Sequence, residues 1–68
     1  MNQWQMLKRE KKARAYAEHF RDNGVTAAEA PEILKMTPDW WRCVADILNL
    51  RPPSEATKRM IQEMLREK

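Results

Sequence analysis

The chain has 68 residues and a mass of 8.1 kDa, which allows one small domain and excludes a multidomain organisation. Its mean hydropathy of −0.85 and its short, charge-interrupted apolar runs predict neither a membrane span nor a secretory signal. With one His, one Ser and one Cys, the chain offers too few reactive side chains for a metal site or a nucleophile–base pair. We therefore expect a protein that is not an enzyme and needs no metal or cofactor. Its single cysteine, Cys43, fits the reducing cytoplasm.

Residues 3–23 are predicted to form a long first helix, because they are rich in strong helix formers and contain neither Gly nor Pro. An apolar stripe at helical spacing, which we expect to face the core, consists of Met6, Ala13, Tyr16, Ala17 and Phe20. Gly24 adopts the left-handed conformation of a helix end more easily than other residues, so it marks the end of this segment.

Two shorter helices are predicted over residues 27–35 and 38–49. Thr26 followed by Glu29 has the spacing of a capping box, and Pro31 requires that the regular helix begin near residues 28–30. Thr37 and Pro38 have the pattern of an N-cap and a first helical residue. The apolar face of the later helix consists of Trp40, Trp41, Val44, Ala45, Ile47 and Leu48.

Ser54 is the predicted cap of a last helix over residues 54–66. Strand patterns are absent from the sequence, so we predict an all-α fold: one compact four-helix domain over residues 1–68, with a long first helix and a helix-turn-helix-like centre. A lone core in a domain of this size seldom contributes more than about 3–5 kcal/mol. For that reason we favour a homodimer over a monomer.

The two central helices have the features of a helix-turn-helix. A small residue in the first helix is followed by a Leu before the turn, an apolar residue in the turn, a polar cap, and buried apolar positions at Trp41 and Val44. Residues 26–65 thereby resemble the helix-turn-helix DNA-binding domain of small phage-repressor-like regulators. The resemblance implies a small DNA-binding regulatory protein that binds double-stranded DNA. Lys35, where Gly is common, and Pro31, inside the first of the paired helices, depart from the pattern.

The distribution of charge indicates which residues would contact DNA. Residues 1–24 have a net charge of +3 and residues 51–68 of +2, whereas residues 25–50 have −2. The candidate nucleic-acid-binding residues are Lys8, Lys11, Lys12 and Arg14 on the first helix and Lys35, Thr37, Asp39 and Arg42 around the turn. The first group would bind the phosphate backbone, and the second would approach the bases. Acidic residues on the later helix oppose phosphate binding, so the helix pair can also be read as a scaffold alone.

A second function class follows from the tryptophans. Trp4, Leu7 and Trp40 are candidate protein-interface residues, since exposed Trp is enriched in binding hot spots. On this hypothesis the chain is a small helical adaptor or inhibitor, similar to those that phages encode, that binds another protein. Trp40 has an alternative interpretation as a residue partly covered by the first or last helix. We expect no membrane binding, because the apolar face of the first helix consists mostly of small residues.

Overall fold

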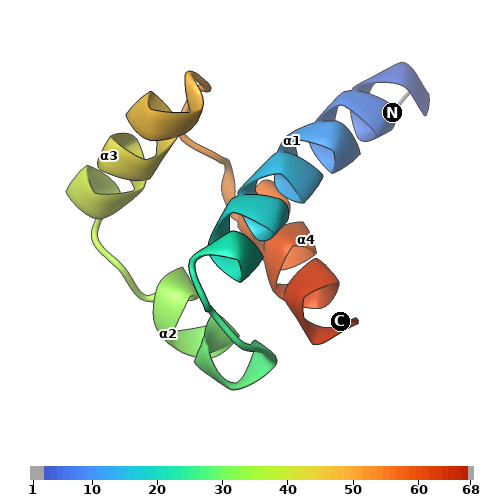
Figure 1. Ribbon diagram of the computed structural model, residues 1–68. Helices are drawn as coiled ribbons and strands as arrows, with labels where there is room; N and C mark the ends of the chain where they lie inside the picture. The colour runs from blue at the N-terminus through green and yellow to red at the C-terminus, as the bar shows by residue number, and fades with distance from the viewer. Residues whose placement is uncertain (1–2, 68) are drawn as a thin grey trace.

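The computed structural model describes residues 3–67, and within them the chain forms four α-helices, one short 3-10 helix and no strand (Figure 1). In chain order the elements are α1 (Gln3–Asp22), η1 (Ala27–Glu29), α2 (Ala30–Leu34), α3 (Pro38–Leu48) and α4 (Glu55–Arg66). The predicted all-α fold is confirmed. None of the helices in residues 3–67 has the length and apolar character needed to cross a membrane.

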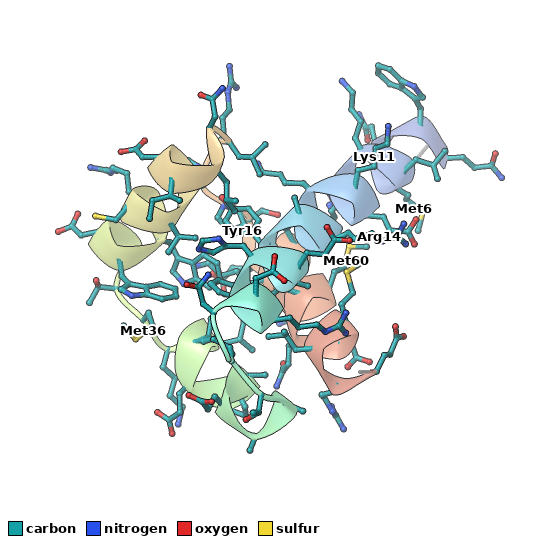
Figure 2. The ribbon with its side chains drawn as sticks, viewed as in Figure 1. Met6, Lys11, Arg14, Tyr16, Met36 and Met60 are labelled. Atoms are coloured by element: carbon teal, nitrogen blue, oxygen red, sulfur yellow. The ribbon has the colours of Figure 1, made fainter. Side chains whose placement is uncertain are left out.

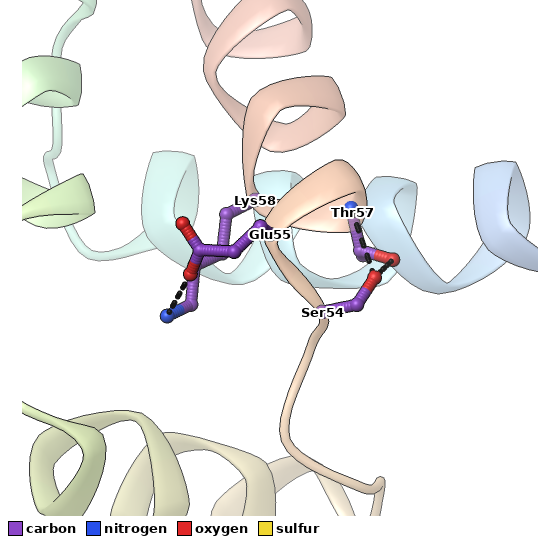
Figure 3. Close-up of polar contacts among 4 residues, drawn as sticks. All are labelled: Ser54, Glu55, Thr57 and Lys58. Atoms are coloured by element: carbon purple, nitrogen blue, oxygen red, sulfur yellow. Dashed lines mark hydrogen bonds and ion pairs between the residues drawn. The ribbon is translucent and has the colours of Figure 1, made fainter.

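Local capping explains where the helices begin and end. After α1, Gly24 takes a φ of 83°, in the left-handed region. At the start of α3 the backbone N–H of Trp40 donates to Thr37 Oγ1 at 3.2 Å. At the start of α4 the backbone N–H of Thr57 donates to Ser54 Oγ at 3.3 Å (Figure 3). These short-range interactions satisfy backbone groups that have no partner inside the helix.

The segment predicted as one helix over residues 27–35 is divided into η1 and α2. Pro31 lies in the first turn of α2, where its missing N–H and fixed φ are tolerated. Ahead of η1, the backbone N–H of Thr26 donates to a carboxylate oxygen of Glu29 at 3.2 Å. Three residues, 35–37, then connect α2 to α3, so the central helices are separate and joined by a tight turn.

The core lies where α1 crosses α4, with η1 and α2 packed against α4 (Figure 1). The buried residues of α1 are Ala13, Tyr16, Ala17 and Phe20, which all belong to the predicted stripe. From the later helices, the core receives Ala30, Ile33, Trp41, Val44, Ala45, Ile61 and Leu65. The Arg21 side chain also donates to the Met64 carbonyl, which ties the end of α1 to α4.

Two residues assigned to apolar faces by the sequence are exposed. Met6 has an exposed fraction of 54%, because the first turns of α1 extend past the helices that cover its later turns (Figures 1 and 2). Ile47 has an exposed fraction of 70%. Around the circumference of α3, Ile47 lies further from the core than Trp40, which is itself only half-buried. The buried face of α3 is therefore narrower than the sequence predicted. Both predictions of burial are wrong.

Large aromatic side chains hold α3 on the rest of the molecule. Figure 1 shows the α3 backbone standing apart from α1 and α4, and the intervening space is filled by an aromatic cluster of Tyr16, Phe20, Trp40 and Trp41. The Trp41 ring meets the Tyr16 and Phe20 rings edge-on, with centroid distances of 5.8 and 5.9 Å. Trp40 stacks on Phe20 at 5.9 Å. The position of α3 therefore depends on the packing of this aromatic cluster.

Candidate nucleic-acid interface

A shallow groove between α1 and the segment that follows α3 collects positive charge; we call it the basic groove. It is lined by Lys8, Lys11, Lys12, Ala15, Asn49, Leu50 and Arg51. Four of these side chains are cations and none is acidic. Lys8, Lys11 and Arg51 are exposed and Lys12 is half-buried, so at least three ammonium or guanidinium groups are accessible to a ligand. Such a set of cations suits an anionic ligand.

The sequence of α1 explains three of these cations. Residues three and four apart in a helix lie on one face, so Lys8, Lys11 and Lys12 point to the same side of α1. Figure 2 shows Lys11 pointing away from the core. The stripe formed by Ala13, Tyr16 and their neighbours is centred on a different face, so burial of the core leaves Lys8 and Lys11 exposed. Lys12, four residues before Tyr16, borders this stripe and is half-buried.

Arg51 reaches the basic groove because the chain after α3 turns back toward α1. Asn49 ends α3 in the left-handed conformation, with φ 59° and ψ 42°. The backbone N–H of Leu50 then donates to the Ala45 carbonyl at 2.8 Å. The Tyr16 hydroxyl donates to the Arg51 carbonyl at 2.9 Å. Because Tyr16 belongs to the aromatic cluster, the position of Arg51 is coupled to the core.

This coupling makes a prediction about Tyr16→Phe. Burial raises the pKa of the Tyr16 hydroxyl above its ordinary value of 10.0, so the group stays protonated and donates at neutral pH. Its stabilising contribution is complete below about pH 10 and is lost as pH rises through the higher folded-state pKa. We expect Tyr16→Phe to lower the free energy of unfolding at neutral pH by about 1 kcal/mol. Urea unfolding of both proteins at neutral and alkaline pH should show this difference shrinking as pH rises. A constant difference would contradict the assigned role.

The residues predicted around the turn lie apart from the basic groove. Lys35 is the C-cap of α2 and is exposed. The Thr37 hydroxyl accepts the backbone N–H of Trp40 as the N-cap of α3. Asp39 and Arg42 are exposed, and their charged groups are 4.0 Å apart. The outward face of α3 thus presents Arg42 with a carboxylate close to it, and Asp46 adds a second acid.

The length of α3 separates these residues from the basic groove. Thr37 and Asn49 cap its two ends. A rise of about 1.5 Å per residue places them roughly 18 Å apart along the helix axis. The basic groove meets α3 only at its C-terminal end, through Asn49 and Leu50. The basic groove therefore brings together three of the eight predicted nucleic-acid-binding residues, namely Lys8, Lys11 and Lys12.

Arg14 lies between two environments. On one side it shares a hollow with Trp4, Leu7, Lys8, Glu10 and Lys11. On the other side it lines a groove between α1 and α4 together with Arg21 and the acidic residues Glu10, Glu18, Glu63 and Glu67. Figure 2 shows Arg14 on the side of α1 where Met60 lies. This surrounding negative charge makes Arg14 a weaker phosphate ligand than the three lysines. The structure thus places it outside the basic groove.

Of the three candidate protein-interface residues, two are exposed and one is packed against the core. Trp4 and Leu7 have exposed fractions of 64% and 57%, and they lie on the first turns of α1 beside Lys8. Trp40 is half-buried, and its ring stacks on Phe20 and meets Trp41 edge-on at 5.1 Å. Trp40 is therefore packed as the second interpretation predicted: it is partly covered, and the residue that covers it is Phe20 of α1.

Arg51 is the site residue that sequence reasoning missed. In the sequence it stands next to Pro52 and Pro53, a context typical of a connecting segment. The local signal that points to it is a cation two residues after Asn49, the C-cap of α3. Its proximity to Lys8 and Lys11 depends on the return of the chain toward α1, which no local pattern encodes.

No group of three or more His, Cys, Asp or Glu side chains that could hold a metal ion occurs in residues 3–67. Cys43 is exposed and forms no disulfide. Comparison of the chain with protein-family models, with curated proteins and with solved structures finds no match. The surfaces of residues 3–67 that are available to a ligand or partner therefore include the basic groove, the outward face of α3 and the exposed first turns of α1.

Proposed function

We propose that this protein is a small, non-enzymatic DNA-binding regulatory protein that holds the phosphate backbone of double-stranded DNA in the basic groove. The observation that carries the proposal is the convergence of Lys8, Lys11, Lys12 and Arg51 from two distant parts of the chain, without an acidic residue in the lining. Neutralised phosphates release condensed counterions, and this release supplies most of the non-specific affinity of DNA-binding proteins. An exposed free thiol at Cys43 suits a reducing compartment, so we place the protein in the cytoplasm.

The α2–α3 pair supports a helix-turn-helix arrangement within this proposal. A three-residue turn joins the two helices, and the outward face of α3 is exposed from Asp39 to Asp46. With α3 directed at a major groove about 12 Å wide, the basic groove at its C-terminal end would meet one flanking phosphate strand. Arg42 is then the candidate for a base contact, because Arg pairs with guanine edges. Asp39 and Asp46 repel phosphate, so we expect most of the affinity to come from α1 and Arg51.

The proposal is tested by the salt dependence of binding. We expect the logarithm of the association constant for mixed-sequence duplex DNA to fall linearly with the logarithm of salt concentration. Since each neutralised phosphate contributes a slope of about −0.9, four cations give a slope of about −3.6. Fluorescence anisotropy at several salt concentrations measures this slope. Undetectable duplex binding at low salt would overturn the proposal.

Arg51→Gln tests whether the basic groove is the phosphate site. The change removes one cation, so we expect the salt slope to become shallower by about 0.9. Arg59→Gln is the matched control, because Arg59 is exposed on α4 and does not line the basic groove. It should leave the slope unchanged. An equal effect of the two variants would mean that net charge alone, without a defined site, accounts for binding.

A second candidate function is that of a helical adaptor or inhibitor that binds a protein, including a second copy of this chain. The exposure of Trp4, Met6 and Leu7 on the unpaired first turns of α1 favours it. Affinity capture from lysate with and without nuclease distinguishes the two functions, because only contacts through nucleic acid are lost on digestion. Leu7→Gln, which removes the apolar surface without a change in charge, should abolish a protein contact and leave duplex affinity close to that of the unaltered protein, whereas charge changes in the basic groove should have the opposite effect.

A further inference from the structure

Trp4 is the one tryptophan among residues 3–67 that the fold leaves mostly exposed. Trp41 is fully buried and Trp40 stacks on Phe20, so both belong to the aromatic cluster. Trp4 has an exposed fraction of 64%, on the part of α1 that extends past the core. A large aromatic ring in that position contributes little to the core, and its surface is available to a ligand.

Lys8 joins Trp4 to the basic groove. The Lys8 ammonium lies over the Trp4 ring, 4.0 Å from its centroid, and the same side chain lines the basic groove. A cation over one face orients the indole, and the exposure of the ring leaves its remaining surface open. Trp4 therefore lies at one end of the row formed by Lys8, Lys11 and Lys12.

The dimensions of this row suit one strand of nucleic acid. From Trp4 to Lys12, α1 rises about 12 Å, a length over which a short run of phosphates of one strand can contact the lysines. Proteins that bind single strands combine a positive groove along the backbone with aromatic side chains on which bases stack. In a paired duplex the base faces are covered by their neighbours, so a ring can stack on them only at the cost of unstacking.

We propose that Trp4 is a base-stacking residue, and that the basic groove together with Trp4 binds a DNA strand with an unpaired base in preference to fully paired duplex. This inference rests on the proposed function, because the phosphates next to the stacked base are held by Lys8, Lys11 and Arg51. The proposed ligand is thus an unpaired segment or a single-stranded end of DNA. The helix-turn-helix alone does not indicate a ligand of this class.

The test compares Trp4→Ala on two DNA probes with nearly equal numbers of phosphates, a single strand of about 24 nucleotides and a blunt two-strand duplex of about 12 base pairs. We expect Trp4→Ala to weaken single-strand binding about tenfold or more and duplex binding less than twofold. Trp4→Phe keeps an aromatic face, so it should remain within about threefold of the unaltered protein while tryptophan quenching by DNA is lost. Leu7→Ala, equally exposed on the next turn but not aromatic, is the control and should change neither affinity. Circular dichroism checks that each variant is folded.

The outcomes separate this inference from the proposed function. Salt-dependent duplex binding with no effect of Trp4→Ala on the single strand would overturn the stacking role and leave the phosphate site intact. Equal losses on both probes would also overturn it, because an unpaired base would then be irrelevant. Loss of self-association in Trp4→Ala with unchanged DNA affinity would assign the ring to a contact between copies of the chain. Failure of the unaltered protein to bind any DNA at low salt would overturn both proposals.

Discussion

Trp41→Ala is expected to leave the protein largely unfolded at room temperature. Trp41 has an exposed fraction of 1%, and its ring contacts Tyr16, Phe20 and Trp40, with Lys58 Nζ 5.3 Å from its centroid. Removal of a buried Trp side chain costs about 3–5 kcal/mol. A lone core of this size contributes about the same amount, so almost no net stability remains. Thermal unfolding followed by circular dichroism measures the effect.

Trp41→Phe is the informative companion to this variant. Trp41 Nε1 is buried and has no hydrogen-bond partner in the described residues, and an unsatisfied buried donor costs about 1–3 kcal/mol. Phe keeps an aromatic ring in the cluster but packs less surface than Trp. Because Phe also removes the unsatisfied donor, part of the free energy lost with the packing is regained. We expect Trp41→Phe to remain folded with a modestly lower melting temperature. A Trp41→Ala protein that melts within a few degrees of the unaltered protein would contradict the central role given to the aromatic cluster.

The double variant Lys8→Glu/Lys11→Glu is expected to reduce affinity for duplex DNA by about 100-fold or more. Two charge-assisted contacts to phosphate are lost, each worth about 1.5–3 kcal/mol, and two like charges are introduced in their place. Both side chains are exposed, whereas Lys12 is half-buried and is left unchanged to protect the fold. Equilibrium binding at constant low salt measures the loss.

Arg59→Glu/Arg66→Glu is the matched control for this double variant. Both arginines are exposed on α4 and lie outside the basic groove, and the change in net charge is the same. We expect it to weaken binding only a few-fold, through the long-range field of the molecule. If the two double variants lose affinity equally, the basic groove has no special role.

Most of the fold could be predicted because its signals are local. Gly24, Thr37 and Ser54 mark the helix ends through backbone conformation or side-chain caps, and these interactions span three residues or fewer. The stripe on α1 was predictable for the same reason, since helical periodicity places Ala13 and Tyr16 on one face whatever covers them. The bounds of α1, α3 and α4 lie within one residue of the predicted ranges for this reason, whereas the helix predicted over residues 27–35 is divided into η1 and α2.

The remaining features depend on which elements meet in space. Met6 continues the α1 stripe in sequence, but α4 approaches the first turns of α1 only through Met60, so Met6 stays exposed. Ile47 has the apolar character of a core residue and lies outside the arc of α3 that the aromatic cluster covers. Arg51 joins Lys8 only because the segment after α3 returns toward α1 and is held by the Tyr16 hydroxyl. These outcomes follow from long-range packing that periodicity and capping do not encode.

The most direct test of the account is a titration of isotope-labelled protein with duplex DNA, followed by backbone amide NMR shifts. We expect the largest shifts on the basic-groove face of α1, from Lys8 to Ala15, and in the segment from Asn49 to Arg51, with smaller shifts along the outward face of α3. The shifts should disappear at high salt. Shifts confined to the groove between α1 and α4, or shifts that persist unchanged as salt is raised, would contradict the assignment of the basic groove as a phosphate-binding site.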